Sequence, residues 1–229
     1  MSEITVGMSE NKQFEVLEPD TYPGRCYMLV DLGTHSVEFK DDKTGQMKKR
    51  EMRKVRLGWE IPAKMRDFGK GKLEPSVIGR EFTASLGGDN KPSKLLEVIQ
   101  GWRGRPFTPD EKKKFSLNKL VGAPALLSVV HAETRGNGRV YAKLNSVAKV
   151  PSGMPVPDPV LKPVIYSVSE GAGGAFNELP NFIKETIMAS KEWLESFQQP
   201  AAPALTPTLA GTQAATQAAP APAEDDVPF

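Results

Sequence analysis

The strongest constraint on this fold is a series of short β-prone runs between residues 25 and 150, each bounded by turn-forming residues. Gly33 lies where a bend or bulge would interrupt the first run, and Asp41-Asp42-Lys43-Thr44-Gly45 predicts a hairpin turn after it. Gly136-Asn137-Gly138 predicts a second hairpin further along the chain. We therefore expect five strands, over residues 25–39, 49–61, 80–86, 121–131 and 140–150.

A helix is predicted between the third and fourth strands. The segment Gly87-Gly88-Asp89-Asn90 breaks the chain, Pro92 is suited to a helix start, and Gly104 is suited to its end. Apolar residues recur at helical spacing between these points, so we expect a buried side made of Leu95, Leu96, Ile99 and Trp102.

A second short helix follows, and it accounts for a motif that resembles a nuclease signature. Asp110, Glu111 and Lys112 imitate the acid-x-Lys pattern of metal-dependent nucleases. In that chemistry the two acids must converge from different strands to hold Mg²⁺, whereas here they are adjacent. Thr108 with Glu111 three residues later, and Pro109 between them, is instead typical of a capping box.

Charge is divided unevenly along the chain, although the net charge is only +2. Residues 1–23 hold one Lys and five acids, residues 24–150 hold 26 Lys or Arg and 14 acids, and residues 151–229 hold three Lys and nine acids. A basic body with acidic ends is typical of a protein that binds a polyanion. The competing interpretation is a soluble domain with a solvated lysine face.

Three strands, a helix and then a two-strand hairpin is the element order of an OB-fold. The sequence therefore predicts a mainly β protein with a five-stranded Greek-key barrel and a helix between strands 3 and 4. Binding to single strands requires cations along the backbone and aromatic rings for base stacking. The candidate cations are Lys48, Lys49, Arg50, Arg53, Lys54, Arg56, Arg103, Arg105, Arg135 and Arg139. The candidate rings are Trp59, Phe107 and Tyr141, each of which could instead be a core residue.

The C-terminal third divides into three parts. Residues 177–198 predict one amphipathic helix, with Ile183, Ile187, Leu194 and Phe197 on its apolar face, packed on the protein's own body or on a second subunit. Ala, Pro, Thr and Gln dominate the next segment, whose composition predicts a disordered linker. The expected organisation is an N-terminal arm at 1–21, a nucleic-acid-binding domain at 22–155, an appendage at 156–198, the linker at 199–223 and an acidic tip at 224–229.

The tip, Glu224-Asp225-Asp226-Val227-Pro228-Phe229, places three carboxylates before an apolar chain end. It resembles the acidic tip of bacterial and bacteriophage single-stranded DNA-binding proteins, and residues 22–150 resemble the OB-fold core of the bacteriophage-encoded members. The resemblance implies that the chain coats single-stranded DNA during replication or recombination and recruits partner proteins through all six tip residues. The linker would also let the tip compete for the basic face, so deletion of residues 221–229 would tighten DNA binding.

Other functions remain open from the sequence: a mediator of strand annealing, an RNA-binding module, or an adaptor that only displays its tip. The oligomeric state is open as well, with a homo-oligomer among the possibilities. A phosphate-binding loop motif is missing, and one Cys and two His cannot form a usual zinc site, so we expect no enzyme, no metal and no cofactor. Cys26 is expected to be a core thiol. With neither a signal peptide nor a membrane span in the sequence, we expect a cytoplasmic protein, in the host cytoplasm if it is viral.

Overall fold

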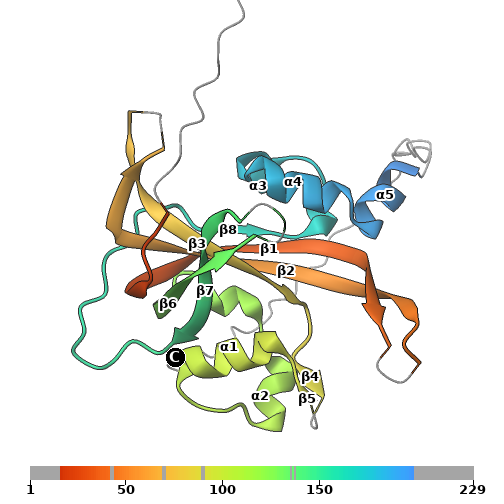
Figure 1. Cartoon of the computed structure of the whole chain (residues 1–229), viewed down its shortest axis with the longest axis horizontal. Coiled ribbons are helices and arrows are strands. Elements are labelled where there is room, and N and C mark those ends of the chain that lie inside the picture. Colours follow the sequence, from red (N-terminus) through yellow and green to blue (C-terminus); the bar gives the residue numbers. More distant parts are fainter. Residues whose placement is uncertain are drawn as a thin grey trace, which may run out of the picture.

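The computed structural model describes residues 16–41, 44–68, 71–88, 91–134, 136 and 138–198. The structure is mainly β, and its principal sheet has the strand order β3-β2-β1-β6-β7, with β8 paired to β1 (Figure 1). The strands are β1 (Asp20–Lys40), β2 (Met47–Asp67), β3 (Leu73–Thr83), β4 (Gly87–Gly88), β5 (Lys91–Pro92), β6 (Pro124–Glu133), β7 (Val140–Ala148) and β8 (Val164–Tyr166). The helices are α1 (Lys94–Arg103), α2 (Pro109–Lys114), α3 (Gly174–Glu178), α4 (Asn181–Met188) and α5 (Lys191–Gln198), with 3-10 turns at Leu117–Leu120 and Val168–Glu170. None of these helices is long and apolar enough to cross a membrane.

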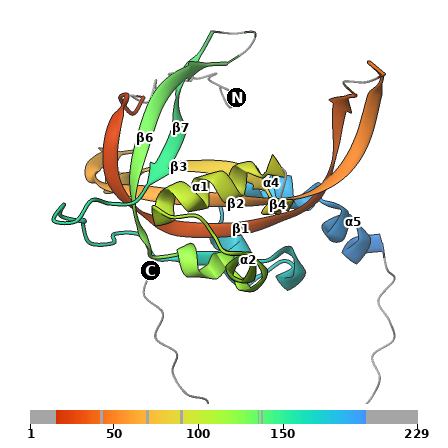
Figure 2. The same cartoon turned by 90° about the horizontal axis from the view of Figure 1, so that it is seen from below.

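Strand β1 organises the sheet because it pairs along both of its edges. Its N-terminal part pairs antiparallel with β6, and most of its length pairs antiparallel with β2. The register with β2 shifts between Asp31 and Gly33, where Gly33 adopts a positive φ of 79°. The predicted bend at Gly33 is therefore confirmed. Figure 2 shows β1 curving beneath the other strands, with its N-terminal end beside β6 and its C-terminal end in the projecting β1–β2 hairpin.

The expected closed barrel is not formed. Strands β3 and β7 are the two edges of the sheet, and among the described residues no ladder pairs one with the other. A cleft lined by residues of both strands lies between them. The sheet is therefore open, and the prediction of a five-stranded barrel is corrected at this seam.

The first core fills one side of the sheet and is capped by α1. Ser93 caps the start of this helix and Gly104, with a φ of 71°, caps its end. Its buried residues are Leu95, Leu96, Ile99 and Trp102, which confirms the predicted buried side. The rings of Trp59 and Trp102 lie 5.7 Å apart in this core. Burial of these apolar side chains fixes α1 against the ends of the strands.

A second core covers the opposite side of β1 and joins the C-terminal third to the sheet. Met28, Val30 and Leu32 of β1 pack there against side chains from α3, α4 and α5. The prediction of one helix over 177–198 is wrong, because the chain divides into α4 and α5. The Ser190 hydroxyl accepts a hydrogen bond from the Trp193 amide and starts α5.

That break also changes which residues of the last helix are buried. Ile183 and Ile187 lie in the second core as expected, but Leu194 is 49% exposed and Trp193 is buried instead. The side chain of Phe197 lies outside the described residues. The predicted packing on the protein's own body is confirmed for both helices, since α4 and α5 contact β1.

A buried carboxylate ties the segment before β8 to β2. Glu60 is fully buried and accepts hydrogen bonds from the amides of Val160, at 3.2 Å, and Leu161, at 2.8 Å. A buried charge is costly unless it is hydrogen-bonded, so these amides are required partners of Glu60. The contact anchors the C-terminal third beside β2 and thereby helps to position α4.

Candidate nucleic-acid interface

A cleft occupies the seam between the two edge strands of the sheet. Its volume is about 360 Å³. Its lining consists of Arg56 from β2, Val77–Arg80 from β3 and Tyr141–Leu144 from β7. Because β3 and β7 do not pair, side chains from both edges face the same space. We call this feature the seam cleft.

A glycine makes room for an arginine at the seam cleft. Gly58 of β2 and Gly79 of β3 are paired opposite each other. A Cβ atom added at Gly79 would lie 2.9 Å from Nη2 of Arg56, so the guanidinium occupies the space that a side chain would need. Arg56 also pairs with Glu81, with 3.3 Å between Nη1 and Oε1. Arg56 is thereby held in one position beside the cleft.

The lining of the seam cleft contains three cations and no acid. Besides Arg56 these are Arg80, which lies over the Phe82 ring at 5.3 Å, and Lys143, which is exposed. Neither Arg80 nor Lys143 forms an ion pair with another described residue. The positive charge of these two residues is therefore available to an anion.

Two exposed aromatic rings lie near these cations, one beside Lys143 and the other against Arg56. Tyr141 shares a face of β7 with Lys143, and its residue is 43% exposed. Phe182 of α4 is 52% exposed, and the Arg56 guanidinium lies 5.0 Å from its ring centroid. Sequence reasoning missed Phe182, since its helix was examined only for an apolar face. A large ring on the exposed side of an amphipathic helix, next to buried Ile183, was the available signal.

The cations predicted in the first hairpin are partly neutralised by neighbouring acids. Lys48 pairs with Asp41, Lys49 lies 3.5 Å from Glu38, and Arg53 makes two hydrogen bonds to Asp31. Strand alternation places even-numbered residues of β2 on one face. That face carries Lys48, Arg50, Lys54 and Arg56 and continues to Gly58 at the seam cleft.

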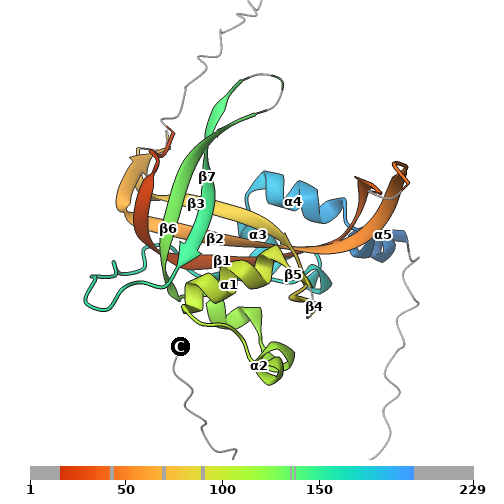
Figure 3. The same cartoon turned by 60° about the horizontal axis from the view of Figure 1, so that its bottom comes forward.

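The two hairpins rise from the same side of the molecule, one at each end of the sheet (Figures 2 and 3). One is β1–β2, with Lys48 and Arg50 near its tip, and the other is β6–β7, with Arg139 near its tip. Strand β3 runs between the bases of the hairpins. Arg139 is exposed, whereas Arg135 lies outside the described residues.

Two of the three predicted stacking rings belong to the core. Trp59 has no exposed surface, and Phe107 is 8% exposed and packs edge-on against Phe115 at 4.9 Å. A base cannot stack on a ring that other side chains already cover, so these two expectations are corrected. The cause for Trp59 is its position on the same face of β2 as Val55 and Leu57. Only Tyr141 of the three presents its ring to solvent.

Arg103 and Arg105 lie beside α2 and do not line the seam cleft. Both donate hydrogen bonds to Oε1 of Glu111, at 2.9 and 2.7 Å. Glu111 also completes the predicted capping box with Thr108, which is confirmed. The hydrogen bond from Arg103, the amide of Thr108 and then Arg105 lower the pKa of Glu111 to about 2. These two arginines therefore do not join the seam cleft.

Comparison with known proteins identifies no relative. The chain matches no protein-family model, no curated protein and no solved structure. Within the part of the chain that the structure describes, no group of three or more His, Cys, Asp and Glu side chains is placed to hold a metal ion. The six tip residues, Glu224 to Phe229, lie outside the described residues. The functional argument accordingly depends on the seam cleft and on the charges around it.

Proposed function

We propose that this protein binds single-stranded DNA along the outer face of β2 and across the seam cleft, and that it protects the strand during replication or recombination. The backbone follows the even-numbered cations of β2 to Arg56, Arg80 and Lys143. Bases stack on Tyr141 and Phe182. The acidic tip, Glu224 to Phe229, recruits partner proteins, as the resemblance to bacteriophage single-stranded DNA-binding proteins implies.

The path of the strands supports an OB-type ancestry for this site. Three strands, a helix and a hairpin follow in that order, and β1 pairs with both β2 and β6. An OB-fold binds oligonucleotides on its second and third strands and on the two loops that flank them. In this protein β2 and β3 correspond to those two strands, and the tips of the β1–β2 and β6–β7 hairpins correspond to the two loops. We interpret the sheet as an OB-type barrel that is open between β3 and β7.

The observation that most supports binding to single strands is the pairing of free cations with exposed rings. Arg80 and Lys143 have no acidic partner among the described residues; Tyr141 lines the cleft with them, and Phe182 lies against Arg56. Proteins that bind single strands without base preference combine these same two kinds of residue. Double-stranded DNA presents phosphates but no unstacked bases, so the rings favour the single strand.

The test is binding of the full-length protein to a fluorescein-labelled oligothymidylate, measured by anisotropy over a series of salt concentrations. Each phosphate contact gives a log-log slope near −0.7, so the three cations of the seam cleft predict a slope of about −2 or steeper. Binding that does not depend on salt, or no binding, would contradict the proposal.

Matched competitors then define the ligand class. An unlabelled duplex with the same total number of phosphates should compete more weakly than the single strand, because the rings would find no free base. An RNA oligomer of equal length tests whether the site distinguishes the sugar, since only contacts near the 2′-hydroxyl can do so. Stronger competition by the duplex than by the single strand would contradict stacking.

A further inference from the structure

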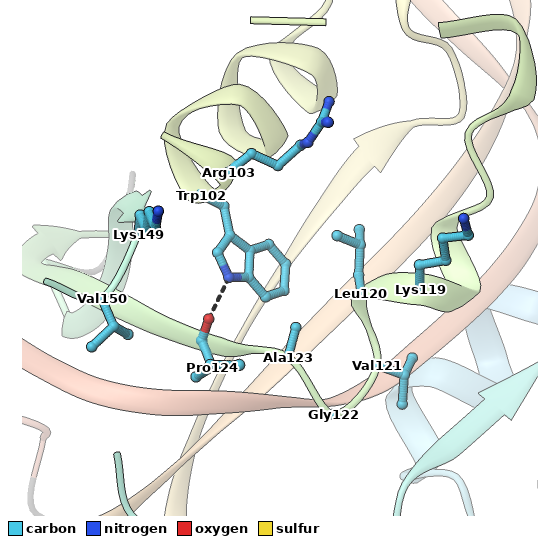
Figure 4. Close-up of a pocket in the computed structure, with 10 residues that line it drawn as sticks. All are labelled: Trp102, Arg103, Lys119, Leu120, Val121, Gly122, Ala123, Pro124, Lys149 and Val150. Carbon is cyan, nitrogen blue, oxygen red and sulfur yellow. Dashed lines mark hydrogen bonds between the residues drawn. The ribbon is translucent and has the colours of Figure 1, made fainter. Parts of the chain in front are cut away.

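A second concavity lies between the end of α1 and the start of β6, away from the seam cleft (Figure 4). Its volume is about 540 Å³, within the range of about 300 to 1,000 Å³ that ligand pockets occupy. The Trp102 indole forms one wall and donates a hydrogen bond of 2.6 Å to the Pro124 carbonyl. Leu120, Ala123 and Val150 supply further apolar surface. We call this feature the indole pocket.

The indole pocket is separate from the proposed DNA site. Strand β7 runs from one to the other: Tyr141–Leu144 line the seam cleft, whereas Lys149 and Val150, just beyond the strand's end, line the indole pocket. The two sites have no lining residue in common. A ligand in the indole pocket would therefore leave the seam cleft open.

Unpaired cations surround the apolar walls. Lys119 and Lys149 are exposed and lie on opposite sides of the Trp102 indole in Figure 4. Neither lysine forms an ion pair with a described residue, and no acid lines the pocket. Arg103 also borders it and is paired with Glu111, but its Nη1 is buried without a hydrogen-bond partner. The ligand that this chemistry favours is anionic at one part and apolar at another.

Residues 224–229 of this chain have that chemistry. Glu224, Asp225 and Asp226 supply three carboxylates. Val227, Pro228 and the Phe229 ring supply the apolar part, within six residues of sequence. Residues 199–223 join this tip to α5, and an extended segment of that length spans up to about 85 Å. The described part of the chain has an expected radius of gyration of about 16 Å, so its whole surface is within reach.

We propose that the acidic tip of this chain docks in its own indole pocket. The Phe229 ring packs on the partly exposed side chains of Val121, Ala123 and Val150, above the Trp102 indole, and the carboxylates lie between Lys119 and Lys149. This revises the expectation that the tip occupies the DNA site. While the tip is docked, Phe229 is not accessible to a partner protein. The tip must therefore dissociate from the indole pocket before a partner can bind it.

The test is the heteronuclear NOE of the Phe229 amide in ¹⁵N-labelled full-length protein without DNA. A docked tip gives a positive NOE, and the indole N–H signal of Trp102 moves when Phe229→Ala is introduced. A variant with Lys119→Glu and Lys149→Glu should weaken docking by about tenfold or more, since two attractions become repulsions. A variant with Lys113→Glu and Lys114→Glu, on the exposed side of α2, has the same net charge and should dock as the wild type does.

Three results would overturn the proposal. One is a negative NOE at Phe229 in the wild-type protein at low salt. Another is a positive NOE that persists in the Lys119→Glu, Lys149→Glu variant, because the tip would then be docked elsewhere. A third is an NOE that is lost on dilution, which would place the tip in a second copy of the chain. None of these measurements involves DNA, so failure here is distinct from failure of the proposed function.

Discussion

The seam cleft and the indole pocket both present cations, yet they favour different ligands. In the seam cleft, Arg80 and Lys143 lie beside rings that are open to solvent. In the indole pocket, Lys119 and Lys149 border apolar walls. Charge attracts an anion to either place, and the apolar surroundings decide which anion gains further free energy. Exposed rings suit a strand of bases, whereas an apolar wall between two lysines suits an acidic peptide with apolar residues.

Charge reversal in the seam cleft should produce the largest effect and separate the two sites. A variant with Arg80→Glu and Lys143→Glu loses two phosphate contacts and gains two repulsions, which predicts about a hundredfold weaker binding to oligothymidylate. The Phe229 NOE should not change, because neither residue borders the indole pocket. Anisotropy titration and NMR on the same sample measure both quantities.

Two controls protect this test against loss of fold and against general charge effects. Lys143→Glu alone changes only an exposed residue and should weaken DNA binding by a smaller factor. The Lys113→Glu, Lys114→Glu variant has the same charge change on α2 and should bind DNA nearly as the wild type does. Equal losses in the α2 variant and the cleft variant would mean that the whole basic body, not the cleft, attracts DNA.

Removal of either exposed ring should have the next largest effect. Tyr141→Ala and Phe182→Ala should each weaken binding to the oligothymidylate by about 1 to 3 kcal/mol, the usual value of one stacked base. The salt dependence should keep its slope, since no phosphate contact is lost. Met188→Ala, also on α4 and 41% exposed, is the matched control for Phe182. An affinity unchanged by Phe182→Ala would remove α4 from the binding site.

The sequence predicted local structure well because its signals are local. Thr108 with Glu111, Gly104 at the end of α1, and Gly33 in β1 each depend on neighbours only a few residues away. The expected helix start at Pro92 was wrong by two residues, because Pro92 lies in β5 and Ser93 caps α1. Closure of the barrel depends instead on how far β1 curves, and alternation of side chains along a strand contains no measure of curvature. The open seam between β3 and β7 could therefore not be predicted.

The candidate site was predicted less completely, for two physical reasons. A count of cations along β2 omits the acids across the ladder, so Lys48 with Asp41 and Arg53 with Asp31 appeared freer than they are. The wall that carries Phe182 comes from a segment far along the chain, and only tertiary packing brings it to Arg56. Trp59 is the opposite case, because its shared face with core residues was already visible in the pattern.

The smallest expected effect is a change in the pKa of Glu111. It tests whether Glu111 holds the nearby arginines, which would leave only the lysines of the indole pocket without an acidic partner among the described residues. Arg103 and Arg105 hold the pKa of Glu111 at about 2, below its ordinary value of 4.5. The pKa is lower in the folded state, so this cluster contributes stability above about pH 4.5 and loses it as the pH falls towards 2. A ¹³C NMR titration of the Glu111 carboxyl carbon should therefore show a midpoint near 2, and Arg105→Gln should raise it. A midpoint at the ordinary value would mean that Arg103 does not bind Glu111. Arg103 would then be available to the tip together with Lys119 and Lys149. The indole pocket would in that case differ from the seam cleft, where Glu81 pairs with Arg56.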